Sequence, residues 1–118
     1  RTPGAGVPSI DRREFLRNLK LRTQTEDAIE SACRNIAEGF GCDTHREFAR
    51  FLEIARRSLN ELQDSLIAAQ VQRFVTASDV RPSRLLLTRL FPAMSRFIAY
   101  LDWTPDNSPR RLSGGMCR

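Results

Sequence analysis

The clearest hydrophobic pattern in the chain lies between residues 44 and 69. Its apolar residues recur at alternating spacings of four and three positions: Phe48, Leu52, Ala55, Leu59, Leu62, Leu66 and Ala69. This period places one apolar seam along an amphipathic α-helix. Thr44 and Glu47 have the T-x-x-E spacing of a capping box, which bonds free backbone N–H groups where a helix starts. The pattern predicts a helix that begins at Thr44.

A similar pattern precedes this helix. The large apolar residues of the preceding stretch are predicted to form its buried seam: Ile29, Cys33, Ile36 and Phe40. A stripe of smaller residues beside the seam would let another backbone approach closely: Ala28, Ala32, Asn35 and Gly39. Phe15 and Leu19 continue the apolar register upstream, but Arg22 and Glu26 interrupt it. We therefore expect the helix, from about residue 10, to bend or leave its partner there.

Two glycines separate the two patterns. Gly39 or Gly41 can adopt the left-handed conformation that ends a helix, and Thr44 starts the next helix a few residues later. Gly39, Gly41 and Thr44 are therefore predicted to form the corner of a helical hairpin.

A third helical stretch is predicted from about Asp79, with Ser78 as its cap. Its apolar residues are Leu87, Leu90, Met94, Phe97 and Leu101. Pro92 removes a helical hydrogen bond, so we expect either a kink or a second helix that starts there. Trp103 is expected to cap the end of the bundle, with a base-stacking platform as the alternative. Strand-type alternation is absent from the sequence, which together with the predicted helical hairpin indicates an all-α fold.

Length and composition indicate one domain. The 118 residues are 41% hydrophobic, enough for one modest core. Glycine and proline gather in residues 1–9 and 105–118, which we expect to be flexible tails around a helical domain at 10–104. No apolar run is long enough to span a membrane and no signal peptide is evident, so a cytoplasmic protein is expected. Cys33, Cys42 and Cys117 form no C-x-x-C pair, which predicts free thiols in a reducing compartment.

The charge is unevenly distributed. The chain carries a net charge of +5. Residues 23–43 hold one basic and five acidic residues, whereas 80–101 hold no acid. A basic excess attracts polyanions, so one hypothesis is phosphate binding by the arginines of the C-terminal part of the chain. These are Arg81, Arg84, Arg89, Arg96, Arg110 and Arg111. The alternative is that they serve only solubility and subunit pairing.

Asn35 and Glu38 are the polar residues that are the strongest candidates for a functional role. They are predicted to belong to a polar network that fixes helix register within or between subunits. Its members are Ser31, Asn35, Glu38, Arg56, Ser58 and Glu61. A catalytic pair is the alternative, but no second carboxylate with a suitable partner accompanies Glu38. Cys42 and His45 have C-x-x-H spacing without further zinc ligands, so we expect no metal and no cofactor.

Two blocks of sequence resemble a known family. The motifs are S-x-x-x-N-I-A-E-G-F-G at 31–41 and E-F-x-R-F-L-x-I-A-R-x-S-L-N-E-L at 47–62. They are similar to the four-helix-bundle proteins encoded in intervening sequences of large-subunit ribosomal RNA genes. The resemblance implies an all-α, antiparallel up-and-down helical bundle of the four-helix type. It also implies assembly into a homo-oligomeric, pentameric ring and a nucleic-acid role, without enzymatic activity.

The chain also departs from this family pattern. Nothing among residues 1–13 resembles the additional N-terminal helix of the family, so either the chain is truncated or its bundle is incomplete. Glu26 and Asp27 stand where the family often has two basic residues. Two hypotheses therefore remain: a nucleic-acid-binding accessory protein, acting on RNA or DNA, and a protein–protein scaffold or adaptor with no nucleic-acid role.

Overall fold

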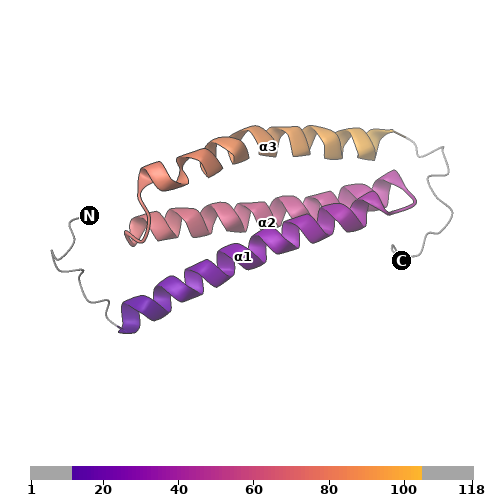
Figure 1. Cartoon of the computed structure of the whole chain (residues 1–118). Coiled ribbons are helices and arrows are strands. Elements are labelled where there is room, and N and C mark those ends of the chain that lie inside the picture. The colour runs from indigo at the N-terminus through magenta and orange to yellow at the C-terminus, as the bar shows by residue number, and fades with distance from the viewer. Residues whose placement is uncertain (1–11, 105–118) are drawn as a thin grey trace.

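The computed structural model describes residues 12–104, and this part of the chain is all α-helical (Figure 1). It contains three helices: α1 (Arg12–Phe40), α2 (His45–Val71) and α3 (Ala77–Trp103). The all-α prediction is confirmed, although three helices rather than four lie within the described range. None of them is long and apolar enough to cross a membrane. The predicted tails lie outside the described residues.

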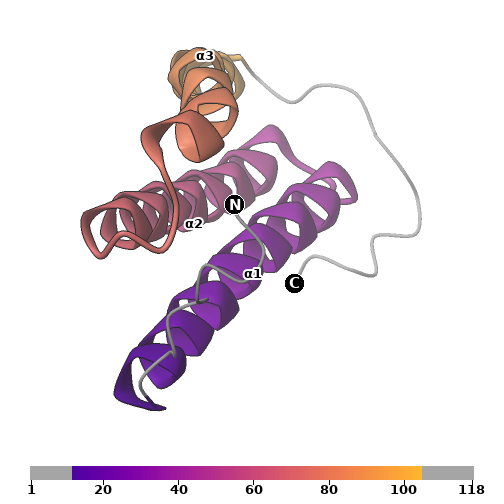
Figure 2. The same cartoon turned by 60° about the vertical axis from the view of Figure 1, so that its left-hand side comes forward.

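Helix α2 is the centre of the arrangement. Both α1 and α3 pack against α2, but α1 and α3 make no contact with each other (Figures 1 and 2). As the seam of alternating spacings predicts, α2 has the largest share of the buried side chains. These are Phe48, Ala49, Leu52, Ala55, Ser58, Leu59 and Leu62. The three helices therefore form an open layer, in which one side of α2 meets α1 and another side meets α3.

Helix α1 buries its small residues instead of its large ones. The buried residues are Ala28, Ala32, Asn35 and Gly39. The predicted seam is wrong for this helix, because Ile29, Ile36 and Phe40 are 45%, 40% and 73% exposed. Small side chains let the two helix backbones approach closely, and the large residues are left on a neighbouring face of α1.

Gly39 marks the closest approach between α1 and α2. A Cβ atom at this position would lie 2.8 Å from the Cβ of Phe51 and 2.9 Å from Cδ1 of Phe48. Neither Gly39 nor Gly41 adopts a positive φ, so the prediction of a left-handed glycine at the corner is wrong. The turn is closed instead by bonds from Gly41 N to Ala37 O (3.3 Å) and from Cys42 N to Gly39 O (3.0 Å).

The two later helices begin at side-chain caps. Thr44 caps α2, since its hydroxyl accepts a bond from the backbone N–H of Glu47 at 3.2 Å, as predicted. For α3 the predicted cap Ser78 is wrong. Thr76 is the cap, and with Asp79 it forms a complete capping box, in which each side chain bonds the other residue's backbone N–H. Asp79 replaces the usual Glu or Gln of this motif.

A left-handed residue ends α2. The N–H of Arg73 bonds Gln70 O at 3.0 Å, and the N–H of Phe74 bonds Ala69 O at 2.9 Å. These two bonds are the Schellman pattern, which places Arg73 at a φ of 66°, where glycine is usual. The left-handed turn therefore lies between α2 and α3 and not at the Gly39–Thr44 corner.

Helix α3 continues through two prolines, Pro82 and Pro92. Each lacks the N–H that would bond the carbonyl four residues earlier. Of the two outcomes expected at Pro92, a new helix does not occur, and Figure 1 shows one curved, unbroken ribbon. Curvature accommodates the missing bonds because the exposed carbonyls can turn toward water.

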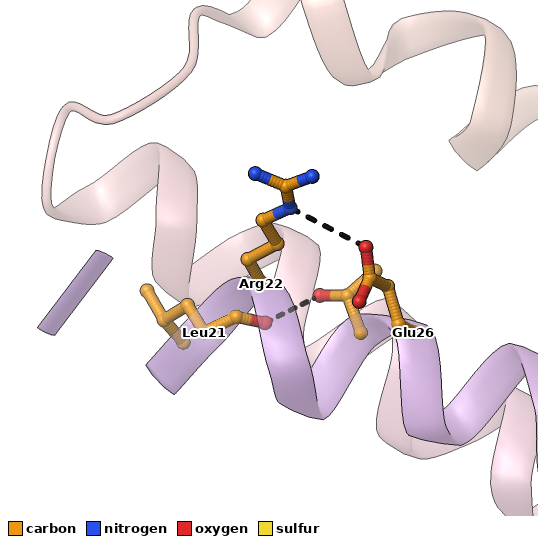
Figure 3. A network of polar contacts seen from close by, with 4 residues as sticks. Leu21, Arg22 and Glu26 are labelled. Atoms are coloured by element: carbon orange, nitrogen blue, oxygen red, sulfur yellow. Dashed lines mark hydrogen bonds and ion pairs between the residues drawn. The ribbon is translucent and has the colours of Figure 1, made fainter. Parts of the chain in front are cut away.

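The first part of α1 leaves α2, as expected. Residues 12–20 are all exposed, and the start of α1 diverges from the other helices in both views (Figures 1 and 2). Arg22 and Glu26, which interrupt the apolar register, pair with each other at 3.3 Å on the surface of α1 (Figure 3). An exposed pair of this kind contributes little to stability.

The cysteines differ from each other. Cys33 is a free, exposed thiol, whereas Cys42 is completely buried and disulfide-bonded. The prediction of free thiols is therefore wrong for Cys42, because an odd number of cysteines does not exclude one bonded pair.

Candidate functional site

The four arginines of α3 lie on its exposed surface. Arg81 and Arg84 come from the first turns of the helix and line a pocket of about 360 Å³ together with Ala77, Leu85 and Thr88. None of the four arginines forms an ion pair with an acidic residue of the described range. Their guanidinium groups are therefore available to an external anion. Arg110 and Arg111 lie outside the described residues.

Arg89 and Arg96 form a second line on α3. They are spaced by seven positions, and Trp103 follows after another seven, so all three share one face of the helix. The Trp103 side chain is 83% exposed. It does not cap the bundle, so that prediction is wrong. The i, i+7 spacing from the two arginines was the signal that could have placed Trp103 on this exposed face.

Three members of the predicted polar network meet between α1 and α2. The hydroxyls of Ser31 and Ser58 lie 2.8 Å apart. The amide of Asn35 donates to Ser31 O at 2.8 Å and approaches Ser31 Oγ at 3.4 Å. Asn35 and Ser58 are 8% and 7% exposed. The polar groups of this cluster form hydrogen bonds to each other inside the interface. Buried polar groups require such partners.

The remaining predicted members lie elsewhere. Arg56 donates to Ser95 Oγ at 2.8 Å and so links α2 to α3 instead of joining the Asn35 cluster. Glu61 is exposed and lines a surface pocket of about 500 Å³ beside α1. Glu38 is partly buried near the end of α1, with its own carbonyl accepting from Gly41 N at 3.2 Å. The structure thus does not bring the six residues into one site.

The pocket beside Glu61 is acidic. Asp27, Glu61 and Asp64 line it, with Arg34 as its one basic residue. Such a surface repels phosphates, whereas the α3 surface between residues 80 and 101 has no acid at all. The α3 side is therefore the better candidate for an anionic partner.

His45 takes part in helix-end contacts. Its Nδ1 lies 3.3 Å from Thr104 Oγ1, and its ring lies 6.4 Å from that of Tyr100. Within the described residues no three His, Cys, Asp or Glu side chains gather in a way that could hold a metal ion. His45 thus joins the start of α2 to the end of α3.

Comparison with known families agrees with these helices and motifs. The model of the family described as 23S rRNA-intervening sequence protein matches residues 11–95, most of the chain. The chain belongs to this family. The match covers α1, α2 and most of α3 of this intervening sequence protein, including Arg81, Arg84 and Arg89. Arg96 and Trp103 lie beyond it. No curated protein and no solved structure matches the chain.

Proposed function

We propose that this intervening sequence protein is a non-enzymatic accessory protein that binds RNA or DNA through the arginines of α3. The observation that carries the proposal is a helix surface with four exposed arginines, no ion-paired partner among the described residues and no acid from residue 80 to 101. Guanidinium groups bind phosphate oxygens by charge-assisted hydrogen bonds.

The two lines of arginines have different roles in this proposal. Arg81 and Arg84 share one pocket and can hold one phosphate between them. Arg89 and Arg96 lie along the exposed face that ends at Trp103, where a base of a single strand can stack. Contacts to phosphates carry no sequence information, so binding is indifferent to sequence.

The test compares variants that remove the same charge from different surfaces. One double variant is Arg81→Gln with Arg84→Gln, and a second is Arg89→Gln with Arg96→Gln. The matched control is Arg50→Gln with Arg57→Gln on the exposed side of α2. Each α3 variant should weaken binding of a labelled RNA or DNA oligonucleotide at all sequences. Its salt slope should fall by about 0.7–0.9 for each phosphate that the variant no longer neutralises.

Gel-shift or anisotropy titrations at about 50 mM salt make this attraction easiest to see. If the control weakens binding as much as either α3 variant, overall charge and not the α3 surface is responsible. If the folded wild-type chain shows no binding at this salt concentration, the proposal fails. The protein scaffold then becomes the better account, and the exposed apolar residues of α1 and α3 favour it.

A further inference from the structure

Two aromatic rings share one face of α3 with two arginines. Successive residues of an α-helix are rotated by about 100° around the axis, and five exposed residues of α3 fall within a sector of about 80°. We call this line the outer face of α3, and its residues are Arg89, Ala93, Arg96, Tyr100 and Trp103. The opposite side of the helix carries the residues that α3 buries toward the core: Leu87, Met94, Ile98 and Leu101. The outer face therefore points away from α2.

The ring of Tyr100 is held in place by its neighbours. It lies nearly parallel to the ring of Phe97, with an interplanar angle of 18° and centroids 6.4 Å apart. Phe97 in turn meets the buried ring of Phe48 edge to face at 5.4 Å, and the ring of His45 lies 6.4 Å from that of Tyr100. Tyr100 nevertheless remains 55% exposed. A ring that is already positioned loses little freedom when a ligand stacks on it.

Trp103 follows Tyr100 by one helical turn and is 83% exposed. A tryptophan side chain can bury about 150–250 Å², so a flat partner that covers this ring gains apolar contact. The neighbouring arginines of the outer face require the same partner to carry negative charge. Asp102 does not oppose that charge on this face, because it lines a different pocket, together with His45 and Arg46. A chain of phosphates that carries flat aromatic bases has both properties.

We infer that the outer face of α3 prefers unpaired nucleic-acid strands, with Arg89 and Arg96 on the phosphates and Tyr100 and Trp103 each stacking one base. The inference rests on the function proposed above and adds the class of strand that is bound. Inside a duplex both faces of a base are already covered by neighbouring bases, whereas the bases of a single strand can turn toward aromatic side chains.

The spacing along the outer face fits a single strand. Arg89 and Trp103 are 14 positions apart in the sequence, which is about 21 Å along the helix axis. This length corresponds to about six nucleotides of a strand that rises about 3.4 Å per nucleotide. Tyr100 and Trp103 are about 4.5 Å apart along the axis, close to the separation of two adjacent bases. Ala93, between the two arginines, leaves room for the sugar–phosphate backbone.

Three DNA probes separate stacking from phosphate contact. They are a single strand of about 12 nucleotides, an abasic strand of the same length and the fully paired duplex, all at about 50 mM salt. The single strand should bind at least about fivefold more tightly than the abasic strand, because only its bases can stack. It should also bind more tightly than the duplex, although phosphate contacts alone would favour the duplex with its higher charge density. The single strand and the duplex made as RNA repeat the comparison.

Substitutions of Trp103 provide the matched test. Trp103→Leu keeps an apolar side chain but removes the flat ring, and Trp103→Phe restores a ring. Trp103→Leu should weaken single-strand binding at least about fivefold without changing the salt slope, whereas Trp103→Phe should retain most of the affinity. The control is Phe15→Leu, at the start of α1, where the side chain is 53% exposed. It should leave the affinity unchanged.

The emission of Trp103 gives a direct measurement, because the chain contains one tryptophan. The single strand should quench this emission, since a base stacked on the indole ring opens a route for decay of the excited state. The abasic strand should bind through the arginines without quenching. Equal affinity for single strand and duplex, unchanged single-strand binding by Trp103→Leu, or unquenched emission would each overturn the inference. If the arginine variants still weaken binding in those cases, the function proposed above stands, whereas absence of binding to every probe would remove both.

Discussion

At the scale of single residues, Gly39 is the position where side-chain size matters most. A Cβ added at Gly39 would lie only 2.8 Å from Phe51 Cβ, so the missing side chain is what lets α1 pack this closely on α2. Gly39→Ala should lower the free energy of unfolding by about 1–3 kcal/mol, because overpacking must push the two helices apart. Chemical denaturation followed by circular dichroism measures this change.

Gly41 is the natural control for Gly39. A Cβ at Gly41 would lie 3.7 Å from its nearest neighbour, Glu38 O, which is ordinary contact. Gly41→Ala should therefore change stability by no more than about 0.5 kcal/mol, or raise it slightly by restricting the unfolded chain. Equal losses in the two variants would show that close approach at Gly39 is not the cause.

Gly39 also shows why the buried face of α1 could not be predicted from the sequence. The apolar period on α1 is correct, but two parallel stripes satisfy it, one of large residues and one of small residues. Burial area favours Ile36 and Phe40, whereas close backbone packing favours Ala32 and Gly39, and the second effect decides which stripe faces α2. The spacing of apolar residues cannot show which of the two effects is stronger, because that depends on the shape of the partner helix.

At the scale of elements, the helix ends are well predicted where one cap is available and poorly where several compete. Thr44 has no competitor, and it caps α2. Near α3 both Thr76 and Ser78 can cap, and Thr76 prevails because Asp79 completes the box with it. Pro92 suggested a break, but tertiary contacts of Met94 and Ile98 with the core keep α3 continuous.

The capping box makes the start of α3 sensitive to acid. The bond that the Asp79 carboxylate accepts from the backbone N–H of Thr76, followed by the interaction with the Thr76 side chain, lowers the pKa of Asp79 below its ordinary value of 3.8. A lowered pKa in the folded state means that the carboxylate stabilises the fold above the unfolded pKa. This contribution should be lost as the pH falls below 3.8 toward the lowered pKa.

Asp79→Asn tests this acid sensitivity. The difference in unfolding free energy between wild type and Asp79→Asn should be largest near neutral pH and should shrink as the pH falls below 3.8. Asp64→Asn, an exposed change in the middle of α2, serves as the control. Thermal melts at a series of pH values provide the measurement, and a difference that is constant with pH would contradict the assignment.

The Ser31–Ser58 contact joins α1 to α2 through a polar bond in a largely apolar interface. Ser31→Ala and Ser58→Ala should each destabilise the protein by about 1 kcal/mol, with a coupling energy of at least about 0.5 kcal/mol in the double variant. Oligonucleotide affinity should not change. An affinity loss without a stability loss would instead support a binding role for the cluster that contains Asn35.

At the scale of the whole molecule, the open layer makes burial very uneven along the chain. Helix α2 is covered on two sides, whereas the first buried residue of α1 is Ala28. The sequence indicated this division through Arg22 and Glu26, which interrupt the apolar register of α1. It could not indicate that α1 and α3 stay apart, because that depends on where each helix meets α2.

Hydrogen exchange should reproduce this gradient of burial. Backbone amides of residues 48–62 in α2 should exchange most slowly, since opening them requires both interfaces to separate. Amides of residues 14–24 should exchange at least about tenfold faster than those of 28–39 in the same helix, because few tertiary contacts oppose local fraying there. Uniform protection along the whole of α1 would mean that its first turns are held by contacts beyond the layer of three helices, and would contradict this gradient of burial.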